Sequence, residues 1–166
     1  MNFTISNRLK HIGAAIQKTP DAFAMLRGGP ENPALFGGVF FHRLTFGTLI
    51  TADISGLPAP ADPCKSPVFG FHIHEGTVCG GDMSDPFGRA MTHYNPGGCD
   101  HPYHAGDMPP LFAANGYAYL SFVSGRFSLS EIIGRVVIIH SKPDDFKTQP
   151  SGDSGVKIAC GVIEKI

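Results

Sequence analysis

Apolar and polar residues alternate along much of the chain, and the alternation begins at Ala22. It is clearest in residues 50–55 and 117–122, where each apolar residue is followed by one that carries a hydroxyl or a carboxylate. Neighbouring side chains of a strand point to opposite faces, so this period-2 pattern indicates strands with one buried face. The expected strands are residues 22–27, 35–42, 48–54, 68–75, 117–122, 136–140 and 157–163.

Glycine and proline interrupt these apolar stretches throughout the chain. The 166 residues include 21 glycines and 14 prolines, and no long stretch has the 3.6-residue period of an amphipathic helix. Many short strands joined by tight turns, at a length that suits one domain, indicate an all-β antiparallel sandwich or barrel. A long loop, residues 76–110, follows the fourth expected strand.

Residues 1–20 lack this pattern, and we expect them to form a short helical or irregular N-terminal extension before a single domain at residues 21–166. Their apolar group, residues 12–16, is too short and too interrupted for the core of a signal peptide. The sequence therefore favours a cytoplasmic location, with an extracytoplasmic one as the alternative if a leader has been removed. No stretch approaches the roughly 18 apolar residues of a membrane span. The formal net charge of -1 gives no bulk attraction to nucleic acid or to an acidic membrane surface.

Histidine is the strongest chemical signal in the sequence. Five of the eight histidines lie close together, at His72, His74, His93, His101 and His104. His72 and His74 are two apart in an expected strand, so both can present an imidazole to one ion. A sixth, His140, ends an apolar run further on. Imidazole suits copper, zinc, nickel and iron, and we predict a metal site; His11 and His42 are interpreted as ordinary hydrogen-bonded histidines.

The loop that carries His101, His104 and Asp107 supports the same prediction. These three residues are evenly spaced in a segment broken by Pro102 and Pro109, which cannot form a long helix. An ion with three or four ligands would hold such a loop in place. The mixed histidine and aspartate set, without a thiolate, argues against a structural zinc finger.

Several motifs point to a known family when they are taken together. They are Gly70–Glu75 (GFHIHE), His93–Pro96 (HYNP), His104–Asp107 (HAGD), Gly134–His140 (GRVVIIH) and Ala159–Ile163 (ACGVI). In this order and at this spacing they resemble the copper,zinc superoxide dismutase family, of the bacterial type, over roughly residues 21–163. The resemblance implies an eight-stranded Greek-key β-barrel or sandwich, immunoglobulin-like in architecture, with long zinc and electrostatic loops.

The resemblance also implies a reaction, two metal ions and their ligands. The implied activity is conversion of superoxide to oxygen and hydrogen peroxide by redox cycling of copper, with zinc beside it. The implied copper ligands are His72, His74, His93 and His140. The implied zinc ligands are His93, His101, His104 and Asp107, so that the imidazolate of His93 bridges the ions and supplies a proton. Asp144 matches an aspartate that accepts hydrogen bonds from His72 and His101.

Further positions follow from the same resemblance. Lys157 stands where the family has an arginine that attracts the superoxide anion, and the change keeps the charge but loses the planar fork. Ser151 matches a small hydroxyl residue that narrows the substrate channel. Cys79 and Cys160 match a disulfide pair, which would close a loop of about eighty residues and stabilise the fold by about 4 kcal/mol. Cys64 and Cys99 remain, as a second pair or as two free thiols.

Two other function classes are consistent with the residues. The first is a protein of the same fold that binds copper and zinc for buffering or delivery without turning over superoxide. The complete pair of ligand sets argues against it, because a carrier has no need of a second, redox-silent ion. The second is a zinc hydrolase, for which Glu75 would be the spare carboxylate. The family forms dimers as well as monomers, so a homodimer is one assembly that the resemblance allows.

Overall fold

The computed structural model describes residues 6–60, 62 and 67–166. Strands dominate it, as the alternating pattern predicts. The elements are α1 (Asn7–Ile16), β1 (Ala22–Gly28), β2 (Phe36–Leu44), β3 (Gly47–Ser55), β4 (Val68–Phe69), β5 (Phe71–His74), the 3-10 helix η1 (Gly88–Ala90), β6 (Leu111–Phe112), β7 (Tyr117–Ser124), α2 (Leu129–Ile132), β8 (Val136–His140) and β9 (Lys157–Lys165).

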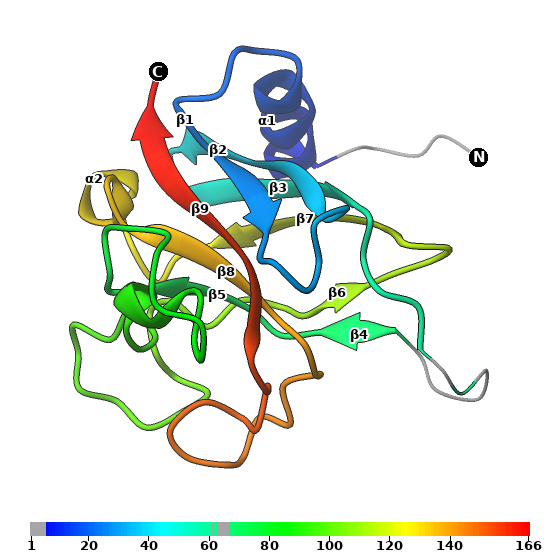
Figure 1. The fold of residues 1–166 in the computed structure, drawn as a ribbon. Helices are drawn as coiled ribbons and strands as arrows, with labels where there is room; N and C mark the ends of the chain where they lie inside the picture. The colour runs from blue at the N-terminus through cyan, green and yellow to red at the C-terminus, as the bar shows by residue number, and fades with distance from the viewer. Residues whose placement is uncertain (1–5, 61, 63–66) are drawn as a thin grey trace.

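Seven of the strands form one curled antiparallel sheet in the order β5-β8-β9-β1-β2-β3-β7 (Figure 1). β4 and β6 form a separate antiparallel pair, and an isolated bridge between Ala114 and Tyr117 connects the end of that pair to the start of β7. The late strands β8 and β9 lie between β5 and β1, a long-range return of the Greek-key kind. The expected all-β Greek-key fold is confirmed.

One expected strand, residues 68–75, is interrupted at Gly70. The Gly70 amide donates to the Lys142 carbonyl at 2.8 Å, and the Gly70 carbonyl accepts from the His140 amide at 2.8 Å. A Cβ on Gly70 would lie 2.9 Å from the Cβ of Ser154 and 3.3 Å from the His72 ring, so a side chain has no room there. Counting β4 and β5 as one interrupted strand turns the nine strands of the described residues into the eight that the resemblance implies.

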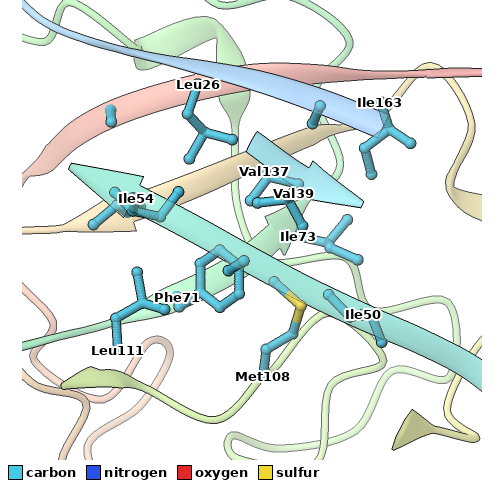
Figure 2. Packing of buried hydrophobic residues seen from close by; sticks show 14 of the residues in the cluster. Leu26, Val39, Ile50, Ile54, Phe71, Ile73, Met108, Leu111, Val137 and Ile163 are labelled. Atoms are coloured by element: carbon cyan, nitrogen blue, oxygen red, sulfur yellow. The ribbon is translucent and has the colours of Figure 1, made fainter. Parts of the chain in front are cut away.

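The core lies inside the curled sheet (Figure 2). The residues labelled there come from most of the strands and from the loop before β6: Leu26, Val39, Ile50, Ile54, Phe71, Ile73, Met108, Leu111, Val137 and Ile163. Every residue of β5 and β8 is buried, which is unusual for strands of an antiparallel sheet with one solvated face. Phe71 and Ile73 face the core, so the histidines that alternate with them must be covered from the other side.

The N-terminal extension forms the helix α1, which packs beside β2 (Figure 1). Ser6 caps it by accepting a hydrogen bond from the Leu9 amide at 3.2 Å. Arg8 lies over the Phe46 ring at 5.5 Å, and the Lys18 carbonyl lies 3.3 Å from His42 Nε2. His42 is thus a buried, hydrogen-bonded histidine, as predicted. The same interpretation of His11 was wrong, because His11 is an exposed residue of α1. Within the described residues, no helix is both long enough and apolar enough to cross a membrane.

Candidate metal centre

The open edge of β5 gathers the predicted ligands. Residues of the long loop, 76–110, return to this edge twice and form isolated bridges, His74 with His93 and His72 with Asp107. Between them, the Ile73 amide donates to the Gly106 carbonyl at 2.9 Å. A second loop, residues 141–156, lies against the first at the same end of the molecule (Figure 1). The edge of β5 is therefore paired with loop residues that are far apart from it in sequence.

The first cluster consists of four imidazoles from three parts of the fold. His72 and His74 come from β5, His140 ends the neighbouring strand β8, and His93 comes from the long loop. One nitrogen of each lies within 4.8 Å of the corresponding nitrogen of every other. His74 Nε2 and His140 Nε2 are 3.1 Å apart, and all four side chains are buried.

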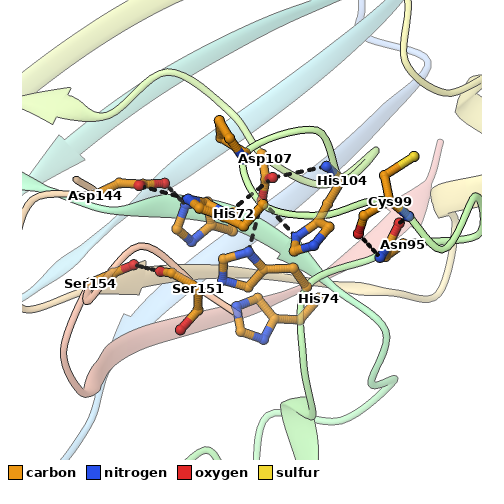
Figure 3. Close-up of polar contacts among 12 residues, drawn as sticks. His72, His74, Asn95, Cys99, His104, Asp107, Asp144, Ser151 and Ser154 are labelled. Carbon is orange, nitrogen blue, oxygen red and sulfur yellow. Dashed lines mark hydrogen bonds and ion pairs between the residues drawn. The ribbon is translucent and has the colours of Figure 1, made fainter. Parts of the chain in front are cut away.

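The second cluster shares His93 with the first and adds His101, His104 and Asp107, whose ligand atoms also lie within 4.8 Å of one another. The Asp107 carboxylate is its centre (Figure 3). His93 Nδ1 lies 2.8 Å from Asp107 Oδ1, His101 Nδ1 3.2 Å from Oδ2, and His104 Nδ1 3.3 Å from Oδ1. The two nitrogens of His93 therefore belong to different clusters, as a bridging imidazolate requires.

The buried nitrogens of these rings test whether metal ions fit. Four of them are buried without a hydrogen-bond partner: His72 Nδ1, His93 Nε2, His101 Nδ1 and His104 Nδ1. A buried polar atom without a partner is costly, and a coordinated cation removes that cost. Four nitrogens suit copper in both oxidation states, and three nitrogens with one carboxylate suit tetrahedral zinc.

In four of the rings, the nitrogen opposite the metal cluster is held by the protein, which fixes the tautomer. Asp144 accepts hydrogen bonds from two rings, with Oδ2 2.9 Å from His72 Nε2 and Oδ1 2.9 Å from His101 Nε2. His74 Nδ1 donates to the Met91 carbonyl at 2.9 Å, and His140 Nδ1 donates to the Gly155 carbonyl at 3.3 Å. Asp144 thus joins the two clusters from behind, as the resemblance implies.

The sequence profile of copper/zinc superoxide dismutase (SODC) matches residues 36–163, most of the chain. The chain belongs to the copper/zinc superoxide dismutase family. Its copper site is His72, His74, His93 and His140, and its zinc site is His93, His101, His104 and Asp107, bridged by His93. It is therefore an oxidoreductase that acts on superoxide.

Bacterial members of the family are its relatives at moderate identity. The chain is 35% identical to a copper/zinc superoxide dismutase of Legionella pneumophila over 144 residues, which cover 82% of each chain. It is 32% identical to that of Deinococcus radiodurans over 148 residues, 78% of each chain. The solved structure of the Brucella abortus enzyme matches with a TM-score of 0.71 at 26% identity, covering 86% of this chain and 99% of that one.

The ionisation of the superoxide dismutase site suits metal binding. Burial lowers the pKa of His72 to about 4, although its hydrogen bond to Asp144 opposes the shift. Burial and repulsion from His72 lower the pKa of His140 to about 3, with a smaller contribution from the nearby Lys157 ammonium. Burial raises the pKa of Asp144, but hydrogen bonds from His72 and the Phe146 amide outweigh it and the net shift is downward. Near neutral pH these imidazoles are neutral and the carboxylate is ionised, as ligation requires.

These shifts predict that the metal-free protein loses stability as the pH falls below about 6.5. The unfolded chain then binds protons on His72, His74 and His140, whereas burial lowers the pKa of all three imidazoles in the folded chain, to about 4 for His72 and about 3 for His140. Stability rises with pH wherever the unfolded state binds more protons, so the loss runs from pH 6.5 down through the folded pKa values. Calorimetry of chelator-treated protein at pH 7, 5.5 and 4.5 measures it, and a melting temperature constant between pH 7 and 5 would contradict the prediction.

The cysteines agree with the pairing that the resemblance implies. Cys79 and Cys160 form a disulfide with a sequence separation of 81, which ties the long loop to β9. Cys99 is an exposed free thiol, and Cys64 lies outside the described residues. The Cys99 amide donates to Asn95 Oδ1 at 3.0 Å, so this part of the zinc loop is held by a side chain (Figure 3).

A cavity of ≈880 Å³ opens onto the copper-side imidazoles His74, His93 and His140. Lys157 and Ser151, the two positions expected at the substrate channel, both line it. Glu75, whose carboxylate the hydrolase interpretation would need, is also a lining residue. All ligands and channel residues expected from the sequence are therefore near this one end of the fold.

Some residues that hold the zinc loop could not be identified from the sequence. Arg126 Nη1 donates to the carbonyls of Pro102 at 2.9 Å and His104 at 3.1 Å. The Gln149 side chain accepts from the His101 amide at 3.0 Å and donates to the His101 carbonyl at 2.8 Å. The expectation that an ion holds this loop is therefore incomplete, because protein side chains also hold it. Arg126 and Gln149 stand in loops without any motif, so the sequence carried no signal for these contacts.

Proposed function

We propose that Lys157 is the group that draws the superoxide anion to the copper side of this dismutase. The observation that carries the proposal is that Lys157 lines the cavity that opens onto His74, His93 and His140. Among the described residues that line this cavity, Lys157 is the only lysine or arginine. A cation in a cleft raises the local concentration of a small anion and the rate of its association.

A copper ion held by His72, His74, His93 and His140 would supply one-electron exchange with superoxide. The protein does the rest. The Met91 and Gly155 carbonyls hold the rings of His74 and His140 by accepting hydrogen bonds from their Nδ1 atoms. The Nε2 atoms of both rings are then left for the copper ion. His93 Nε2 has no hydrogen-bond partner and can hold a proton for the peroxide product, while Nδ1 stays with the zinc cluster. Ser151 narrows the entrance.

Replacing Lys157 by methionine is expected to lower the rate constant for superoxide by about tenfold at low ionic strength, because the steering cation is lost. Arginine at this position should keep or raise the rate, because its planar fork restores fixed donors. Pulse radiolysis at low and high salt measures both, and the rate of the unchanged protein should fall as salt rises. Lys142→Met is the control, since Lys142 is exposed and pairs with Asp153 at 3.4 Å outside the cavity lining.

A lower rate for Lys157→Arg, or a rate of Lys157→Met equal to that of the unchanged protein, would contradict this role. The cytoplasmic location and the homodimer stay predictions from the sequence.

A further inference from the structure

In the cavity that leads to the copper side, most of the charged lining residues are acidic. Its charged lining residues are Glu31, Glu75, Asp85 and Lys157. The substrate is an anion, so three carboxylates around a single ammonium work against its entry. One of the three carboxylates, that of Asp85, also contacts the ammonium directly.

Asp85 forms an ion pair with Lys157. Lys157 Nζ lies 2.7 Å from Asp85 Oδ2, and the two side chains are 16% and 46% exposed respectively. At this distance the pair is a charge-assisted hydrogen bond, stronger than a bond between neutral groups. The ammonium that should bind the substrate is thus already bound to a carboxylate of the same chain.

The loop around Asp85 holds its carboxylate in place. Asp85 Oδ1 accepts from the Phe87 amide at 3.1 Å, and the Asp85 carbonyl accepts from the amides of Asp82 at 3.1 Å and Gly88 at 3.0 Å. Before this turn, the disulfide at Cys79 ties the loop to β9, the strand that begins at Lys157. The pair therefore links two anchored segments.

We propose that Asp85 is a built-in competitor of superoxide for Lys157 and sets the affinity of the channel for small anions. The proposal rests on the proposed role of Lys157. An entering anion has to take the ammonium from Asp85 Oδ2, or bind beside a neutralised pair. Attraction at long range is reduced as well, because the charges of the pair largely cancel beyond the pair itself.

Asp85→Asn tests the proposal in protein loaded with copper and zinc. Asparagine keeps an acceptor for the Phe87 amide and removes the charge. The rate constant for superoxide at low ionic strength should rise by about threefold, and it should fall more steeply with salt than in the unchanged protein. Azide, a small monoanion, should bind about threefold more tightly, as titrated through the visible spectrum of the copper form.

Asp82→Asn is the matched control. Asp82 lies in the same loop and is fully exposed, and its carboxylate accepts hydrogen bonds from Ser84 and from the Asp85 amide. The Asp82→Asn substitution removes the same charge from the loop and leaves the ion pair of Lys157 in place. The rate constant for superoxide and the affinity for azide should therefore equal those of the unchanged protein within experimental error. In Lys157→Met/Asp85→Asn, the gain over Lys157→Met should be smaller than the gain of Asp85→Asn over the unchanged protein, because only the general repulsion of the anion by Asp85 remains once Lys157 is absent.

The two substitutions separate the competition by Asp85 from the steering role of Lys157. An unchanged or lower rate in Asp85→Asn, beside a reduced rate in Lys157→Met, would overturn the competition and leave the role of Lys157 standing. An unchanged rate in Lys157→Met would instead overturn the proposed function. If Asp85→Asn melts well below the unchanged protein, Asp85→Ser replaces it, because a serine hydroxyl also accepts from an amide two residues on.

Discussion

Replacing His140 by alanine is expected to reduce superoxide turnover by more than about 100-fold. Loss of a residue that only orients a metal ligand already lowers metal affinity or activity by about 10- to 100-fold, and His140 is itself a ligand. His140 ends β8, and its Nε2 is 3.1 Å from His74 Nε2, so it supplies one quarter of the copper-side nitrogen set. Alanine leaves three imidazoles and an open space beside the substrate cavity. Pulse radiolysis gives the rate, and metal analysis gives the copper and zinc content.

The two metals should respond differently to this substitution. His140 is not a member of the zinc cluster, so the zinc content is expected to stay close to one ion per chain while copper is lost. His11→Ala is the control, because His11 is an exposed residue of α1 at the far end of the molecule from the metal loops. A variant at His140 that keeps both copper and most of its rate would show that the ring is not a ligand.

The alternation of side chains predicted most of the sheet because burial on one face is a local property of a strand. β8 has the expected bounds, and β3 and β9 extend the expected ones by one or two residues at an end. β6 was missed, since it has only two residues, Leu111 and Phe112, and two residues carry no period. At the break, Gly70 bonds through its backbone to Lys142 and His140, partners about seventy positions away that reach it only in the folded chain.

The ligands were predictable for a different reason. Histidine and aspartate are rarely buried together without a chemical use, so their spacing and motifs remain visible in the sequence. Asp85, by contrast, could not be identified from the sequence. It stands in an ordinary Asp-Pro turn, and its significance comes from Lys157, which lies 72 positions later in the chain. A single charge pair between a loop and the start of a distant strand leaves no pattern in either segment.

Replacing Asp144 by alanine is expected to weaken both metal sites by about 10- to 100-fold, the usual effect of removing a group that orients ligands. The carboxylate accepts hydrogen bonds from His72 Nε2 and His101 Nε2 at 2.9 Å each. Asp144 is buried, so water does not compete for these two bonds. Without it, neither ring has a fixed tautomer. Competition with a chelator measures the affinities for copper and zinc, and equal affinities in variant and unchanged protein would contradict the prediction.

Asp145→Asn is the matched control for this position. Its carboxylate is exposed and accepts from the Lys147 and Thr148 amides at 2.9 Å, as a local cap of the loop. The substitution removes the same charge one residue away and leaves every imidazole partner in place. Both metal affinities should remain unchanged, so that any loss in Asp144→Ala reports on the two hydrogen bonds and not on net charge.

Asparagine at position 144 should separate the two sites. Asp144 Oδ1 accepts from both His101 Nε2 and the Phe146 amide, at 2.9 and 2.7 Å, so the single oxygen of the amide is expected to take this place. The amide nitrogen then faces the Nε2–H of His72, where two donors meet and neither has an acceptor. Gly152, whose Cβ would lie 2.0 Å from Oδ1, shows how little room the group has to turn. Asp144→Asn should therefore weaken copper binding more than zinc binding, and an equal loss at both sites would show that the amide does not keep this orientation.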